Sequence, residues 1–288
     1  MDYLLIFVDT LTGTAAWVWR NIIFEVPIVE NYFWGLTIIS LAVWSAEILF
    51  PWRSDQKLMR HNFWQDAWYM YFNFFIFSIM ISGIYQVLSH MFNRLGIETD
   101  SLTIIDLSSL PLILQLLVFF ILLDLLQWCT HVCLHRFQIL WRFHQLHHDT
   151  KQMGFAAHLR YHWMENILYK PMKTLGVMVL GGFEPEHAYI IHFASIVIGH
   201  LNHANLRLSY GPFKYIFNNP VMHLYHHAYH LPQQHHHGIN FGISLSIWDY
   251  IFKTAYIPES SGRVVLGFNG DDNIPTSFWR QLFWGFKK

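Results

Sequence analysis

The sequence predicts an all-α protein with several membrane helices and a histidine-rich helical cap on the cytosolic side. The 288-residue chain is 53% hydrophobic and only 13% charged, about half the charged share of a typical soluble domain. Its apolar stretches reach the length of about 20 residues that a bilayer-spanning helix needs. All of its 20 histidines except His61 and His90 lie between His131 and His237, and many recur three or four residues apart, as on one face of a helix.

Four apolar stretches in the first half of the chain are candidate membrane segments. Residues 32–50, 67–92 and 110–133 are each long and apolar enough to span a bilayer. Residues 3–24 are interrupted by Asp9 and three threonines, so this stretch either spans the bilayer or lies in its interface. We therefore expect about four spans, or two helical hairpins.

The charges of the connecting loops predict how these helices are oriented. Residues 51–62 carry three Lys or Arg residues, whereas residues 93–109 carry one Arg against three acidic residues. Because positively charged loops stay in the cytoplasm, we expect the first loop on the cytoplasmic side and the second on the other side. The third clear helix then runs back inward and places His131 and all that follows on the cytoplasmic side. Both a bacterial inner membrane and the endoplasmic reticulum fit this orientation.

The second half of the chain is less apolar. Residues 174–183 and 188–201 are hydrophobic but short, so we expect a re-entrant or interfacial hairpin. From residue 204 onward the chain is polar and rich in turn residues, which is typical of a cap on the membrane surface. The net charge of -1 gives no reason to expect nucleic acid as a partner, since that would call for a basic face. Cys129 and Cys133 are expected to be buried thiols rather than a disulfide.

Three histidine clusters have helical spacing. The word H-x-x-H-H occurs at His144–His148 and again at His223–His227, and H-x-x-x-H occurs at His131–His135. On a helix, each word points its imidazoles at a common volume. Without a cation these eight imidazoles would leave buried polar atoms unpaired, or would repel one another when protonated. The clusters therefore predict metal ligation, and so many ligands predict two metal ions.

The residues alone leave the metal open, because imidazole suits Zn, Fe, Cu and Ni. The sequence contains no H-E-x-x-H, which disfavours a zinc hydrolase, and no G-x-S-x-G nucleophile turn. Asp124 shares a helical face with His131 and His135, so we expect its carboxylate to hold a histidine N–H.

These motifs resemble a known family, the fatty acid hydroxylase and sterol desaturase superfamily of membrane di-iron oxygenases. The resemblance covers residues 124–254. The matching elements are Asp124 before H-V-C-L-H, L-W-R-F-H-Q-L-H-H at 140–148, R-Y-H-W-M-E at 160–165, H-A-N-L from His203, H-L-Y-H-H from His223, N-F-G at 240–242 and W-D-Y-I-F at 248–252. The chain departs from the family pattern at Val132, at Lys253 and in the histidine-rich stretch 230–238, which leaves the subfamily and its substrate open.

The resemblance implies a set of site residues. His162 and His200 are candidates for one further ligand position, and Asp124 and Asp249 are expected to be the supporting carboxylates. His235–His237 are expected to form an exposed or interfacial loop. The ligands that the resemblance implies are His131, His135, His144, His147, His148, His203, His223, His226 and His227.

The resemblance also implies a division of the chain and a function. Residues 1–110 would be membrane anchor helices, 111–254 the catalytic region and 255–288 a C-terminal tail. The expected cofactor is two Fe ions, which Zn can replace in a purified sample. The expected reaction is hydroxylation of a lipid C–H bond, in a fatty acyl chain, a sterol or a related lipid, with O₂ and two external electrons. The sequence has neither G-x-G-x-x-G nor a haem domain, so the donor would be a separate ferredoxin, cytochrome or reductase.

Two other readings use the same residues differently. A lipid or sterol desaturase, or an ether-lipid monooxygenase, could be built on the same site. A membrane metal-binding or transport protein belongs to a different class and predicts polar residues along several spans. The clear spans carry few such residues, which favours the oxygenase.

Overall fold

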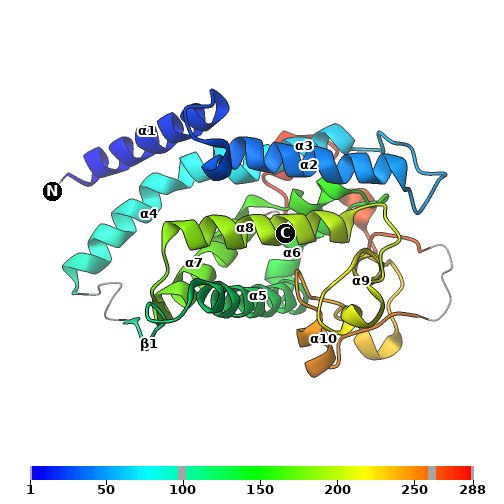
Figure 1. The fold of residues 1–288 in the computed structure, drawn as a ribbon. Coiled ribbons are helices and arrows are strands. Elements are labelled where there is room, and N and C mark those ends of the chain that lie inside the picture. The colour runs from blue at the N-terminus through cyan, green and yellow to red at the C-terminus, as the bar shows by residue number, and fades with distance from the viewer. Residues whose placement is uncertain (1, 97–101, 259–263, 287–288) are drawn as a thin grey trace.

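The apolar stretches form helices in the computed structural model, which describes residues 2–96, 102–258 and 264–286 (Figure 1). A π-helical turn at Phe72–Ile76 joins α3 and α4 into one continuous helix. The elements are α1 (Tyr3–Ile22), α2 (Tyr32–Leu49), α3 (Phe63–Tyr71), α4 (Phe77–Arg94), β1 (Ile105–Asp106), α5 (Leu112–Arg136), α6 (Gln138–His148), α7 (Trp163–Val179), β2 (Leu180–Gly181), α8 (Pro185–His203), α9 (Pro220–His226), α10 (Ile247–Ile251) and α11 (Phe278–Gln281), with short 3₁₀ turns between them.

The chain is mostly helical, as predicted, and has three candidate membrane helices among its described residues, where about four spans were expected. They are Tyr32–Leu49, Phe63–Arg94 and Leu112–Arg136. The weaker stretch 3–24 forms α1, which is long enough to span a bilayer but less apolar than these three helices. α1 packs along α4 (Figure 1). Gly83 of α4 lets the ring and backbone of Phe7 approach closely.

α7 and α8 are longer than the two short apolar stretches expected at 174–183 and 188–201. α7 begins at Trp163 because a capping box closes its first turn: the His162 ring accepts from the Met164 N–H, and Glu165 accepts from the His162 N–H. The first turn contains polar residues, so the apolar stretch in the sequence begins well after the helix does. α7 packs beside α5, and β1 pairs with β2 in a short parallel ladder that ties the start of α5 to the end of α7.

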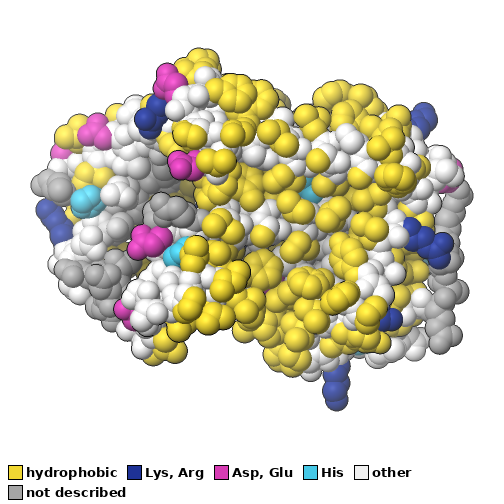
Figure 2. All heavy atoms as spheres, viewed as in Figure 1, with side chains coloured by type: hydrophobic (Ala, Val, Ile, Leu, Met, Phe, Trp, Pro, Cys, Tyr) yellow, Lys and Arg dark blue, Asp and Glu magenta, His cyan; other side chains and the backbone are white. Residues whose placement is uncertain are grey.

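The surface suggests how the molecule sits in a bilayer. Figure 2 shows hydrophobic side chains covering the middle of one face, with most Asp and Glu toward one end and Lys and Arg at both ends. Exposed apolar residues such as Leu41, Met80 and Ile113 lie on the three candidate membrane helices, and lipid would cover such a surface. The basic loop 51–62 lies at the histidine-rich end, where the Trp52 N–H donates to the Asn205 carbonyl over 2.8 Å.

The C-terminal residues expected as a tail pack back onto the bundle. The Tyr69 hydroxyl donates to Gln281 over 3.0 Å, and the Trp163 indole donates to the Leu282 carbonyl over 2.8 Å. Tyr69, Leu146 and Ile274 form a small core cluster beneath α6. This segment therefore supports α6, the helix that carries the first H-x-x-H-H.

Candidate metal centre

The three histidine clusters lie on helix ends, as their spacing predicts. α5 ends in the pair His131 and His135, α6 carries the first H-x-x-H-H, and α9 carries the second up to its C-cap residue His227. The chain has extended backbone at Phe137, with φ -95° and ψ 116°, so α6 turns back against the end of α5. His203, the last residue of α8, meets the others from a fourth helix.

The clusters combine into two groups of histidines. Within each group, one ring nitrogen of every histidine lies within 4.8 Å of those of the others. We call them group 1 and group 2. Group 1 is His131, His135, His144, His148 and His226, and group 2 is His147, His203, His223 and His227. All nine histidines expected as ligands are thus brought together. The groups are neighbours, because the rings of His148 and His227 stack at 4.3 Å.

Each H-x-x-H-H word serves both groups, which differs from the expectation of one common volume per word. The middle histidine of the first word, His147, points to group 2 while its two partners point to group 1. In the second word, the middle histidine His226 points to group 1, while His223 and His227 point to group 2. Residues i, i+3 and i+4 share a broad helical face, but their side chains diverge enough to reach two adjacent volumes.

The hydrogen bonds of group 2 leave unprotonated Nε2 atoms facing one another. The Nδ1 atoms of His147 and His203 donate to the carbonyls of Arg160 and Gly199, over 3.0 and 2.8 Å. A backbone carbonyl only accepts, so in the neutral rings each Nε2 carries a lone pair. These two Nε2 atoms lie 3.3 Å apart, and the Nε2 of His223 is 2.9 Å from that of His203. Facing acceptors require a cation between them, so the donor set fits a metal ion.

Group 1 has the same arrangement. The Nδ1 atoms of His131 and His226 donate to the carbonyls of Phe241 and Ile239, over 2.8 and 2.7 Å. The Nε2 atoms of His135, His148 and His226 are buried without a hydrogen-bond partner, an arrangement that is costly in a protein interior unless a metal ion takes the lone pairs.

Burial keeps the imidazoles in the form that binds metals. It lowers the pKa of His147 to about 4 and holds the pKa values of His148, His223 and His227 well below the ordinary 6.5. Neighbouring imidazoles lower three of these values further. At neutral pH these rings are therefore uncharged and need lose no proton to bind a cation.

Two backbone carbonyls of one segment support group 1. In the segment Ile239–Phe241, the Ile239 carbonyl accepts from His226 and the Phe241 carbonyl accepts from His131. Sequence motifs do not reveal such support, because carbonyl acceptors are independent of side-chain identity. This segment directly follows the histidine-rich stretch 230–238, and it fixes the orientation of two imidazoles.

The two aspartates expected as supporting carboxylates hold the backbone between residues 241 and 245 instead of a histidine. Asp124 accepts from the N–H groups of Ser244 and Leu245 and from the Trp248 indole, at 2.9–3.2 Å. Asp249 accepts from the N–H groups of residues 241 and 242 and from the Trp128 indole. Asp124 shares a face with His131 along α5, but the loop at 244–245 offers it backbone donors, while the His131 N–H points to a carbonyl.

The two candidates for a further ligand lie outside both groups. The His162 Nε2 donates to the Leu282 carbonyl over 3.0 Å, and its Nδ1 caps α7. The His200 ring lies between His158, at 2.8 Å, and the Ser40 hydroxyl, at 3.0 Å. Both rings have their two nitrogens occupied by protein partners, which leaves neither free for a metal ion.

Comparison with known proteins identifies the region that contains both groups. A family model for fatty acid hydroxylase matches residues 116–254, which include every histidine of groups 1 and 2. The chain carries a fatty acid hydroxylase domain. This confirms the resemblance that the sequence motifs indicated, and the membrane helices lie mostly before the domain.

Curated relatives resemble the chain over this hydroxylase domain. Ornithine lipid hydroxylase OlsE of Rhizobium tropici is 26% identical over 178 residues, 62% of this chain and 52% of that protein. Alkylglycerol monooxygenases of Xenopus tropicalis and Danio rerio are 24% and 28% identical over 53% and 48% of this chain. The matches span about half of the first relative and less than a third of the other two. No solved structure matches the chain.

Glu165, the last residue of the R-Y-H-W-M-E element, contacts a grouped histidine. Glu165 of the hydroxylase domain lies 3.0 Å from the Nδ1 of His144. Burial raises the pKa of Glu165 to about 8, so its charged form needs a positive charge nearby. A metal ion on the Nε2 of His144 would supply that charge, and the carboxylate would in turn fix the ring and increase its basicity.

Replacing this carboxylate tests its role. We expect Glu165→Gln to lower metal affinity roughly 10–100-fold, the usual effect of losing such an outer partner. Metal retention during titration with a chelator measures the change. Glu25→Gln, at an exposed glutamate, is the matched control, and equal retention in the two variants would contradict the assignment.

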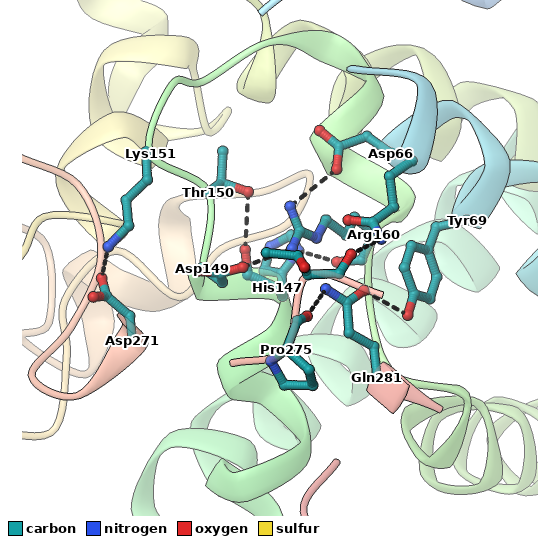
Figure 3. Close-up of polar contacts among 12 residues, drawn as sticks. Asp66, Tyr69, His147, Asp149, Thr150, Lys151, Arg160, Asp271, Pro275 and Gln281 are labelled. Atoms are coloured by element: carbon teal, nitrogen blue, oxygen red, sulfur yellow. Dashed lines mark hydrogen bonds and ion pairs between the residues drawn. The ribbon is translucent and has the colours of Figure 1, made fainter. Parts of the chain in front are cut away.

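A buried ion network supports group 2 from behind. Figure 3 shows the Arg160 guanidinium between Asp66 and Asp149, at 3.1 and 2.7 Å, with His147 beside it. Asp66 also pairs with Arg60, and all three charged groups in the core of this network are almost fully buried. Because the Arg160 carbonyl accepts from His147, the network fixes the backbone that orients a group 2 imidazole.

Proposed function

We propose that the chain is a membrane-bound di-iron oxygenase that hydroxylates a lipid. The two adjacent all-imidazole groups carry this proposal, because their facing lone pairs call for two cations side by side. The fatty acid hydroxylase domain and the lipid hydroxylase and monooxygenase relatives favour oxidation of a lipid C–H bond. The overall reaction is R–H, O₂, two electrons and two protons giving R–OH and water.

The residues around the groups serve the reaction in definite ways. Groups 1 and 2 would each hold one iron ion, and two such ions supply O₂ activation and C–H oxidation. Trp141 and Phe241 pack against the His135 ring at 5.0 and 5.1 Å, and group 1 is shielded from water by these aromatic side chains. The carbonyl and carboxylate partners hold every oriented Nδ1–H in place, so the Nε2 atoms stay directed inward.

The position of the site in the membrane is part of the proposal. The basic loop 51–62 contacts the histidine-rich end through Trp52 and Arg53. Under the positive-inside rule this contact supports a cytoplasmic position for the metal groups. A lipid would then enter from the bilayer, and a separate soluble or membrane donor would deliver the two electrons from the cytosol.

The decisive experiment is comparison of all lipids in a host that expresses the intact chain with those in a host that expresses His147→Ala. We expect a lipid that has gained one oxygen atom only with the intact chain. Loss of two hydrogen atoms would identify a desaturase, and an alkyl lipid cleaved at its ether bond would identify an ether-lipid monooxygenase. Unchanged lipids with altered cellular metal would overturn the proposal in favour of transport.

A further inference from the structure

A pocket of about 330 Å³ lies beside group 1, between the end of α5 and the histidine-rich stretch 230–238. Its polar side is lined by Arg136, Gln234 and His235–His237, and its apolar side by Trp128, Phe241 and Phe252. Phe241 separates the pocket from the metal groups, since its ring lies 5.1 Å from His135 and 5.8 Å from His131.

The polar side of this pocket is suited to an anion. One guanidinium and three imidazoles line it, and no carboxylate is among its described lining residues. Arg136 is exposed at the end of α5 and lines the pocket together with His237. A guanidinium binds phosphate or carboxylate through paired N–H donors, so the pocket offers an anion one charged donor group with imidazole N–H donors around it.

The apolar side of the pocket is suited to a hydrocarbon chain. Trp128 and Phe252 stack at 4.7 Å and form one wall. The neighbouring surface is also apolar, because Phe252, Ile251 and Phe137 are each more than half exposed. α5 is a candidate membrane helix that ends at Arg136, so this surface lies where the bilayer meets water. A ligand of this pocket therefore has an anionic end and an apolar end.

We propose that this pocket binds the anionic head group of the lipid substrate and that Arg136 selects for its negative charge. The inference rests on the proposed lipid oxidation and adds the chemical class of the substrate: a lipid with a phosphate or carboxylate at its head. A head group bound in the pocket would be separated from group 1 by the Phe241 ring. Arg136 is a specificity residue, and the metal groups do not include it.

Binding of matched amphiphiles tests the proposal. The protein, loaded with metal in nanodiscs of zwitterionic lipid, is titrated with dodecyl phosphate and separately with dodecanol, which has no charge. We expect Arg136→Gln to weaken dodecyl phosphate binding about tenfold, the effect of losing one charge-assisted contact. Binding of dodecanol should not change. Arg207→Gln, at an exposed arginine outside the pocket, should change neither affinity.

Three results would overturn the proposal: unchanged binding in Arg136→Gln, equal weakening for both amphiphiles, or displacement of dodecyl phosphate by an equal concentration of inorganic phosphate. The last would mean that the pocket binds free phosphate. Arg136→Gln must keep the metal content of the unmodified protein. Loss of metal would mean that the substitution disturbs the neighbouring ligand His135. These binding results stand apart from turnover. If the chain binds the anionic amphiphile but oxidises no lipid, the proposed function fails and the head-group site remains.

Discussion

Alanine at a grouped histidine is expected to remove metal and to reduce lipid oxidation by far more than about a hundredfold, the upper effect of losing only an outer partner of a ligand. The two groups should respond differently. Group 2 offers four imidazoles, so His223→Ala leaves three, whereas group 1 offers five and His226→Ala leaves four. We therefore expect His223→Ala to fall to about one metal ion per chain and His226→Ala to keep more of its second ion. Elemental analysis of purified variants, paired with oxygen-dependent turnover, measures both effects.

The matched control for these variants is His61→Ala, at an exposed histidine of the basic loop 51–62. It should keep both the metal content and the activity of the unmodified protein. Full metal content and full activity in His223→Ala and His226→Ala would contradict two metal sites. Loss of both metals in each variant would instead mean that the two groups bind their ions cooperatively.

The grouped histidines were predictable because their spacing is a local signal. Residues three and four apart meet on a helix whatever the tertiary structure does, so the clusters on α5, α6 and α9 follow from the sequence. His203, at the end of α8, lies outside the three clusters, and only the family motif indicated it as a ligand. The division of each word between two groups depends on how α6 and α9 face each other, which spacing does not encode.

The partners of the histidines were much less predictable. Asp124 has the right helical register for His131, yet the partner of a carboxylate is decided by which donors the fold brings nearby, here two loop N–H groups. The carbonyls of Ile239 and Phe241 that hold His226 and His131 leave no trace in the side-chain pattern. Glu165 was visible within R-Y-H-W-M-E, but only the structure places its carboxylate against His144.

The membrane helices also divide into those that a local sequence signal predicts and one that it does not. Long apolar runs are recognised from composition, so the three candidate spans were placed within a few residues of their ends. α7 begins with the buried polar residues Glu165 and Asn166, which serve the site and interrupt the apolar pattern. A helix that both crosses the bundle and supports a polar site is therefore under-predicted from hydropathy.

Removing Asp66 is expected to destabilise the folded protein strongly. Its carboxylate is fully buried and pairs with two guanidinium groups, Arg60 and Arg160, that are themselves nearly inaccessible. Asp66→Ala would leave Arg60 without its carboxylate partner in the interior, and breaking such a pair costs about 3–5 kcal/mol. The expected result is an equal fall in the free energy of unfolding, measured by denaturant titration in mild detergent. Because Arg160 also positions the carbonyl that holds His147, metal retention should fall with it.

A second ion pair in the same region gives the comparison. Lys151 pairs with Asp271 (Figure 3), but the Lys151 side chain is 44% exposed, so water already solvates much of its charge. We expect Lys151→Ala to lower the free energy of unfolding less than Asp66→Ala does, because Asp271, although 6% exposed, keeps the Phe268 N–H as a donor. Similar losses in the two variants would mean that the buried pairs of Asp66 contribute no more than the partly exposed pair of Lys151. A large loss confined to Asp66→Ala, accompanied by weaker metal retention, would link the stability of this network to the orientation of a group 2 imidazole.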